Sequence, residues 1–90
     1  MKGIKVVYNE DTKFILEILE KIPIKFMSET HNTSLHKNKK KAYEIMERYG
    51  TRNFPLLVFE DENLEEYGAI WSESKPDWEK EIIKKLSNEF

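Results

Sequence analysis

The chain has 90 residues and a mass of 10.8 kDa, which is enough for one small domain with a modest core. Its 15 basic and 17 acidic residues give a net charge of −2, so the chain as a whole has no electrostatic preference for nucleic acid or an anionic membrane. The absence of cysteine excludes disulfide bonds, thiolate metal ligands and every thiol-based mechanism. No apolar run is long enough for a signal peptide or a membrane span, so we expect a cytoplasmic protein.

The beginning of the sequence predicts a strand followed by a helix. Residues 4–8 are mostly β-branched or aromatic, which is typical of a strand covered on both faces. Over 13–22, apolar residues recur every three or four positions, as in an amphipathic helix. Asp11 or Thr12 is expected to be its N-cap, and Pro23 marks its end. The apolar side of this helix comprises Phe14, Ile15, Ile18, Leu19 and Ile22.

A second strand and a second helix are predicted next, joined by a polar segment. The strand covers 24–27, where apolar and polar residues alternate weakly. The polar segment covers 28–41, and a helix is expected to begin within it, near Thr33 or Ser34, and to end with Gly50 as its C-cap. Its apolar stripe has the spacing i, i+3, i+4 and i+7 and comprises Ala42, Ile45, Met46 and Tyr49.

The second half of the sequence predicts a hairpin and a final helix. Four consecutive apolar residues at 56–59 favour a central strand, and 64–69 returns after a polar turn as its antiparallel partner. Glu65 and Glu66 are typical of an edge strand that charge protects from further pairing. Residues 74–77, Ser-Lys-Pro-Asp, have the form of a capping box. The helix after it carries one apolar side, which comprises Trp78, Ile82, Ile83, Leu86 and Phe90.

The predicted order of elements is therefore β-α-β-α-β-β-α. The first crossover is long enough for a right-handed parallel βαβ unit, and the last two strands pair as a hairpin. Three helices that cover both faces of a four-stranded mixed sheet make an α/β/α sandwich. No internal repeat or linker divides the chain, so we expect one domain over residues 1–90.

Residues 49–61, Tyr-Gly-Thr-Arg-Asn-Phe-Pro-Leu-Leu-Val-Phe-Glu-Asp, resemble the thioredoxin family. In that family a helix ends in Tyr-Gly, a short loop leads to a proline, and an apolar strand follows. The similarity continues through residues 67–70 into the final helix, and the element order extends it to nearly the whole length. The resemblance implies a thioredoxin-like fold. The short start, with a strand leading directly into a helix, is more similar to glutaredoxins and small thioredoxins than to full-length thioredoxin.

The resemblance also implies a binding groove at one end of the sheet. The Phe54–Pro55 peptide bond would be cis, and the backbone groups of Phe54 would face outward to pair with an extended partner segment. Trp71 would offer an exposed aromatic ring, whereas Trp78 is expected to anchor the last helix in the core. The implied groove comprises Asn9, Glu10, Asp11, Thr12, Lys13, Arg52, Asn53, Phe54, Pro55, Gly68, Ala69 and Trp71.

This chain departs from the family at the position that carries the family's chemistry. The C-x-x-C dithiol of the family lies between the first strand and the first helix, and residues 9–14 of this chain, Asn-Glu-Asp-Thr-Lys-Phe, hold no thiol there. Without a thiolate, thiol–disulfide exchange is impossible. The sequence therefore predicts a redox-inactive module that binds another protein through the groove and uses no cofactor.

One alternative is a glutathione-binding or glutathione-transferase-like protein. Tyr8 ends the first strand just before the groove. The position is similar to that of a tyrosine that stabilises the glutathione thiolate in some glutathione transferases. The simpler interpretation is that Tyr8 packs at the end of the sheet.

A second alternative is a nucleic-acid-associated module. Lys37, Lys39, Lys40 and Lys41 form a basic run of the kind that neutralises phosphate charges. Against this alternative, no aromatic residue lies within the run, and lysines in a loop are usually only solvated. His31 and His36 lie near the run, but they are five positions apart and lack the i, i+4 spacing of a helical metal pair, so no metal site is predicted.

Overall fold

The computed structural model describes residues 2–35, 37, 39–71 and 77–87. The elements within these ranges follow the predicted order, with one added turn of 3-10 helix (η1) ahead of the first α-helix. They are β1 (Gly3–Tyr8), η1 (Glu10–Thr12), α1 (Phe14–Glu20), β2 (Met27–Asn32), α2 (Lys39–Tyr49), β3 (Leu56–Glu60), β4 (Glu66–Trp71) and α3 (Trp78–Ser87).

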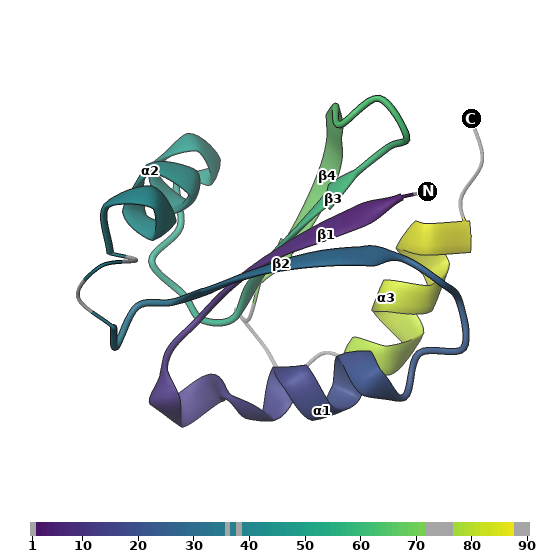
Figure 1. The fold of residues 1–90 in the computed structure, drawn as a ribbon, viewed down its shortest axis with the longest axis horizontal. Helices are drawn as coiled ribbons and strands as arrows, with labels where there is room; N and C mark the ends of the chain where they lie inside the picture. The colour runs from purple at the N-terminus through teal and green to yellow at the C-terminus, as the bar shows by residue number, and fades with distance from the viewer. Residues whose placement is uncertain (1, 36, 38, 72–76, 88–90) are drawn as a thin grey trace.

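The strands form one four-stranded mixed sheet in the order β2-β1-β3-β4. β1 and β2 run parallel, with α1 in the crossover between them, whereas β3 is antiparallel to both β1 and β4. β1 and β3 are therefore the central strands, which agrees with the apolar run of 56–59 and with the expectation that both faces of 4–8 are covered. The expected fold class, a mixed α/β sheet with helices on both faces, is confirmed (Figure 1).

The helices divide between the two faces of the sheet (Figure 1). α1 and α3 lie together on one face, and α2 lies on the other; we call these the α1–α3 face and the α2 face. The side chains of β1 alternate accordingly, since Ile4, Val6 and Tyr8 pack with α1 and α3, while Val7 packs with α2. The apolar cluster on the α1–α3 face is the larger one, and Phe59 is fully buried in it.

The second strand lies further along the chain than predicted. It covers Met27–Asn32 and not 24–27. β2 is an edge strand whose first four side chains are exposed, so its sequence shows no apolar alternation, and its position depends on backbone pairing with β1. Ile24 and Phe26, which suggested the earlier strand, pack against the cluster of the α1–α3 face from the segment before β2.

The second helix begins later than predicted. It begins at Lys39 and not near Thr33 or Ser34. The reason is that Thr33 is held at the end of β1, where its backbone N–H and its hydroxyl both donate to the Tyr8 carbonyl, at 2.8 and 3.3 Å. The predicted end is confirmed, because Gly50 follows α2 with a φ of +65°, a left-handed C-cap conformation that glycine adopts without a Cβ penalty.

The return strand of the hairpin is shifted by two residues from its predicted position, whereas β3 begins at Leu56 as predicted. β4 covers Glu66–Trp71 and not 64–69, because the turn extends to Glu65, whose carbonyl accepts from the Asp61 N–H at 2.9 Å. β4 is an edge strand, as predicted.

The last helix begins at Trp78, which is 8% exposed and anchors α3 in the core as predicted. Asp77 caps this helix by accepting from the backbone N–H of Lys80 at 3.2 Å. Residues 74–76 of the predicted capping box, and Phe90, lie outside the described residues. Neither α3 nor any other helix in the described ranges has the length and apolar character needed to cross a bilayer.

Candidate functional site

Most of the implied groove residues meet at one end of the sheet. The strand register pairs Val7 with Leu56 and Leu56 with Trp71, so the end of β1, the start of β3 and the end of β4 lie side by side. The chain leaves β1 through Asn9–Lys13 and enters β3 through Arg52–Pro55 at this same end. We call these two segments, together with Trp71, the sheet-end surface.

Asn9 and Thr12 close the turn between β1 and α1 by bonding to each other. The Thr12 N–H donates to Asn9 Oδ1 (3.0 Å), the Asn9 N–H donates to Thr12 Oγ1 (3.0 Å), and the Thr12 hydroxyl donates to Asn9 Oδ1 (2.8 Å). This reciprocal capping box makes Asn9 the cap of η1. The prediction of Asp11 or Thr12 as a helix N-cap is therefore wrong, and α1 itself begins after Lys13 without a side-chain cap.

Side chains from the end of β2 hold the same turn from outside. The Asn32 amide donates to the Glu10 carboxylate (3.0 Å), the Glu10 N–H donates to the Ser34 hydroxyl (3.2 Å), and the Ser34 N–H donates to Asn32 Oδ1 (2.9 Å). These three residues form a closed ring of hydrogen bonds. No local sequence signal predicts the ring, because it depends on the parallel pairing of β1 with β2.

Phe14 is a surface residue that the sequence pattern misses. Periodicity assigns it to the apolar stripe of the first helix, but its side chain is 45% exposed. Because η1 turns more tightly than an α-helix, the buried side of α1 begins only with the fully buried Ile15. An aromatic ring is thus exposed next to Lys13, at the border of the sheet-end surface.

The loop that enters β3 presents polar residues outside and apolar residues inside. The Phe54–Pro55 peptide bond is cis, as the resemblance implies, and Pro55 is buried. Phe54 is half-buried and packs against the apolar cluster of the α2 face. Arg52 and Asn53 are exposed, and the Asn53 N–H donates to the Thr51 hydroxyl at 3.1 Å.

Gly68 and Ala69 precede the end of β4 that carries Trp71, so they lie outside the sheet-end surface as defined above. Both are interior residues of β4, and Gly68 pairs with Phe59. Phe59 is four residues beyond Pro55, which corresponds to about 13 Å along a strand. Gly68 instead faces α3, where a Cβ at this position would lie 3.3 Å from the ammonium of Lys85.

Tyr8 and Trp71, two aromatic residues at the sheet end, are both at least partly buried. Tyr8 is 7% exposed and packs in the cluster of the α1–α3 face, which agrees with the simpler interpretation of this residue. The glutathione alternative needs an accessible ring at this position. Trp71 is half-buried and packs against the cluster of the α2 face, so its side chain is only partly accessible.

His31 is buried on β2, next to a pair of charged residues. Its Nε2 atom lies 3.6 Å from the Glu29 carboxylate, which the Lys41 ammonium of α2 contacts at 3.0 Å. The hydrogen bond from Lys41 is the main reason that the pKa of the Glu29 carboxyl is lowered. His36 lies outside the described residues. Within the described ranges, no group of three or more histidine, aspartate and glutamate residues is arranged to hold a metal ion.

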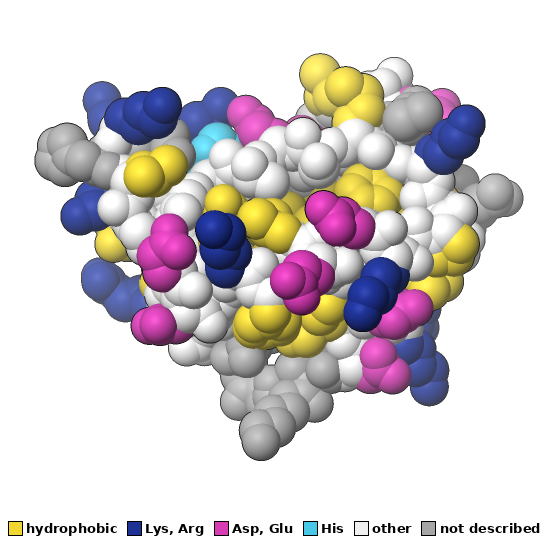
Figure 2. Space-filling model, turned by 60° about the horizontal axis from the view of Figure 1, so that its bottom comes forward, with side chains coloured by type: hydrophobic (Ala, Val, Ile, Leu, Met, Phe, Trp, Pro, Cys, Tyr) yellow, Lys and Arg dark blue, Asp and Glu magenta, His cyan; other side chains and the backbone are white. Residues whose placement is uncertain are grey.

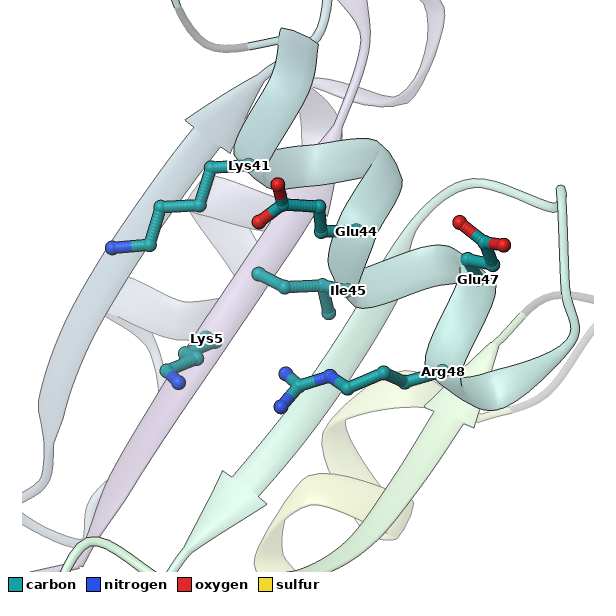
Figure 3. A pocket seen from close by; sticks show the side chains of 6 residues that line it. All are labelled: Lys5, Lys41, Glu44, Ile45, Glu47 and Arg48. Atoms are coloured by element: carbon teal, nitrogen blue, oxygen red, sulfur yellow. The ribbon is translucent and has the colours of Figure 1, made fainter.

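Hollows flank α2 on both sides. The first has a volume of about 580 Å³ and is lined by β1 and one flank of α2 (Figure 3), through Lys5, Lys41, Glu44, Ile45, Glu47 and Arg48. The second has a volume of about 420 Å³ and lies at the C-terminal end of the helix, where it is lined by Tyr43, Met46, Glu47, Gly50, Thr51 and Arg52. Arg52 lines the second hollow and is also part of the sheet-end surface, so this hollow adjoins the sheet-end surface.

A bonded polar cluster lies beside the first hollow. Glu66 accepts hydrogen bonds from the Tyr49 hydroxyl (2.6 Å) and the Arg48 guanidinium (2.8 Å). The Lys5 ammonium lies 3.5 Å from both Glu60 and Glu66. The Glu66 carboxylate is therefore bonded within the protein. It does not face solvent to protect the strand edge, which is the role that the sequence suggested for it. The cationic groups that line this hollow are already paired.

The polar cluster shifts the protonation of its members. Burial, followed by the hydrogen bond to Glu66, raises the pKa of Tyr49 to about 12. Burial alone would raise the pKa of the Glu66 carboxyl. The hydrogen bond from Tyr49 and the charges of Arg48 and Lys5 together outweigh this effect, so the pKa of Glu66 is lowered. At neutral pH the cluster therefore holds a neutral phenol and an ionised carboxylate.

The comparisons with known proteins agree with this topology. The pneumococcal exposed lipoprotein thioredoxin Etrx1 from Streptococcus pneumoniae strain TIGR4 is similar in structure, with a TM-score of 0.56 and 15% sequence identity, over 94% of this chain and 84% of that chain. At this identity, the likeness shows the fold alone. The chain thus has a thioredoxin-like fold. No protein-family model matches the sequence, and no curated protein matches it.

Proposed function

We propose that this chain is a redox-inactive, thioredoxin-like module that binds an extended segment of another protein at the sheet-end surface. The sequence holds no thiol, so it has no group that attacks a disulfide. The resemblance assigns the dithiol position to the turn that Asn9 and Thr12 close by their own hydrogen bonds. The surface is therefore suited to recognition and not to thiol chemistry.

The observation that carries this proposal is that the turn is held from two sides. The Asn9–Thr12 capping box fixes it from within, and the hydrogen bonds of Glu10 with Asn32 and Ser34 fix it from the neighbouring strand. A surface that is ordered before binding loses less conformational freedom when a partner arrives, which favours affinity.

The groups around this turn have the composition of a protein-binding surface. Phe14 is 45% exposed, and Phe54 is half-buried on the neighbouring loop. Lys13, Arg52 and Asn53 are exposed around these rings. Aromatic anchors within a polar rim are typical of sites where one protein recognises another.

Peptides selected from a random display library against the folded chain test the proposal. We expect the selected peptides to shift the amide resonances of Asn9–Lys13 and Arg52–Phe54 in NMR spectra. Phe14→Ser is expected to weaken their binding about tenfold or more, because an aromatic anchor is lost.

Met27→Ser is the matched control, because Met27 is 62% exposed and pairs with Gly3 at the opposite end of the sheet. This variant should bind the peptides as the wild-type chain does. Equal losses in both variants, or resonance shifts confined to other surfaces, would refute the proposal.

A further inference from the structure

The first turn of α2 carries an unusual concentration of positive charge. Lys39, Lys40 and Lys41 occupy it with no acidic residue among them. Cations are unfavourable at a helix N-terminus, where the helix dipole is positive. Lys41 is offset by Glu29 at 3.0 Å, whereas Lys39 and Lys40 are exposed and have no ion-pair partner among the described residues. Figure 2 shows several Lys and Arg side chains at the end of the molecule that carries α2 in Figure 1, and others at the centre and the opposite end.

An exposed aromatic residue follows these lysines on the same side of the helix. Tyr43 is four positions after Lys39 and three after Lys40, so the three side chains are neighbours on the helix surface. The Tyr43 ring is 49% exposed. In the sequence Tyr43 lies just beyond the basic run, but the helical spacing places it beside Lys39 and Lys40.

The second hollow continues this line of residues toward the end of the helix. Tyr43 forms its near border, and the exposed Arg52 forms its far border. From Lys39 to Gly50 the helix rises about 16 Å. Along this flank the surface presents, in order, the ammonium groups of Lys39 and Lys40, an exposed aromatic ring, a hollow of about 420 Å³ and a guanidinium.

We propose that this flank of α2 binds single-stranded nucleic acid. The ammonium groups of Lys39 and Lys40 contact phosphates at one end, a base stacks on Tyr43, the next base enters the hollow, and Arg52 contacts a further phosphate. Alternation of cationic groups with a stacking ring is the arrangement by which proteins bind single strands without strong sequence preference. It distinguishes this surface from a purely basic patch, which any polyanion would satisfy.

The acidic residue in the hollow restricts what can occupy it. Glu47 lines this hollow together with Tyr43 and Arg52, and its carboxylate repels a phosphate. The same carboxylate can accept a hydrogen bond from an exocyclic amino group of a base, as acidic residues do elsewhere in nucleic-acid recognition. A base and not the backbone therefore occupies the hollow.

Fluorescence anisotropy with short, labelled single-stranded oligonucleotides over a series of salt concentrations tests this inference on the full chain. The double variant Lys39→Glu/Lys40→Glu is expected to lose binding and to reduce the slope of log affinity against log salt by about 1.4, since each phosphate contact on a single strand contributes about 0.7. This reversal places acidic residues at a helix N-terminus, which favours the helix, so lost binding is not lost folding. The control is Lys80→Glu/Lys84→Glu on α3, which has the same net charge as the first double variant. This control should bind as the wild-type chain does.

The aromatic contact is tested separately from the charge. Tyr43→Ala is expected to weaken binding at least about fivefold, the lower limit for losing one stacked base, and Tyr43→Phe should restore it. A duplex of the same sequence should bind more weakly, because its bases are not available for stacking. Equal losses in both charge-reversed variants, no effect of Tyr43→Ala, or binding to anionic phosphatidylserine vesicles without binding to oligonucleotides would each overturn the inference.

Discussion

The α1–α3 face of the sheet carries a closed apolar cluster beneath two helices, whereas the α2 face carries a smaller apolar cluster bordered by charged side chains and hollows. On the first face, residues from β1, β3, α1 and α3 bury one another. On the second, a single helix covers the sheet and leaves both of its flanks accessible. The comparison indicates that the first face supplies most of the stability and the second face is free to carry binding groups.

Truncating one isoleucine on each face is the strongest test of this difference. Ile82 on α3 is fully buried in the cluster of the α1–α3 face, whereas Ile45 on α2 is 3% exposed and borders the first hollow. Ile82→Ala should lower the free energy of unfolding by about 4–5 kcal/mol, because the closed cluster retains a cavity. Ile45→Ala should cost about 2–3 kcal/mol, because its site opens to solvent.

Urea denaturation of both variants measures the two free energies of unfolding. The substitution is the same and both residues lie within helices, so the difference reports the surroundings and not the helix propensity. Equal losses, or a larger loss at Ile45, would show that the α2 face is as tightly packed as the other.

The apolar interior could be predicted from the sequence, because burial on both faces leaves a continuous apolar run. Residues 56–59 show such a run, and 4–8 show one that only Lys5 interrupts; these segments are the two central strands. β2 gives no such signal, since an edge strand with four exposed side chains is specified by its backbone pairing with β1. The start of α2 cannot be predicted from the sequence either, because the hydrogen bonds of Thr33 to Tyr8 are tertiary contacts.

The candidate site could be predicted only where a local motif marks it. The Phe54–Pro55 segment and the loop after β1 were identified through the family resemblance, and both lie at the sheet end. The bonding of Glu10 to Asn32 and Ser34 joins segments more than 20 residues apart, so no local pattern reveals it. The position of Gly68 opposite Phe59 depends on the hairpin register, which the sequence does not reveal.

The second prediction concerns the polar cluster of the α2 face. Glu66→Gln removes the charge that Arg48 and Lys5 contact and should lower the free energy of unfolding by about 1–2 kcal/mol at neutral pH. Because the pKa of Glu66 is lowered in the folded chain, its contribution is present above the ordinary carboxyl pKa of about 4.3 and is lost as the pH falls through the folded value. Unfolding free energies measured from neutral to acidic pH should therefore fall less in Glu66→Gln than in the wild-type chain.

Glu65→Gln is the matched control for the acid dependence. Glu65 is exposed beside Glu66 and takes part in the turn through its backbone. Its variant should follow the wild-type pH curve. A wild-type curve in Glu66→Gln would mean that the cluster adds no pH-dependent stability to the α2 face.

The third prediction compares a tyrosine on each face under alkaline conditions. Tyr49 titrates near pH 12, because burial and the Glu66 carboxylate both oppose its ionisation. Burial, followed by the charge of Asp61, raises the pKa of Tyr67, whose hydroxyl donates to the Lys85 carbonyl. Since a raised pKa favours the protonated form in the folded chain, this stability is present below about pH 10 and is lost as the pH rises through the folded value.

Tyrosinate absorbance, measured as the difference between the wild-type chain and Tyr49→Phe, isolates the titration of Tyr49. Glu66→Gln should move this titration toward the ordinary pKa of about 10 and leave that of Tyr67 unchanged. Tyr49→Phe itself should cost about 1 kcal/mol at neutral pH. If Glu66→Gln shifted both tyrosines equally, the effect would be a general loosening of the fold and not the loss of one carboxylate on the α2 face.

The smallest expected effect concerns the lysines at the start of α2, and its sign is the informative part. Lys41→Met loses an exposed ion pair with Glu29, worth about 0.2–1 kcal/mol, but also removes a cation from a helix N-terminus, so the two effects nearly cancel. Lys39→Met and Lys40→Met lose no such pair within the described residues and should each raise the free energy of unfolding by about 0.3–1 kcal/mol. Thermal unfolding at low salt measures all three. A gain in stability at 39 and 40 would mean that these two lysines oppose folding, as expected for groups whose role is to contact an anionic partner; a loss would make them structural and would weaken the case for binding along this flank.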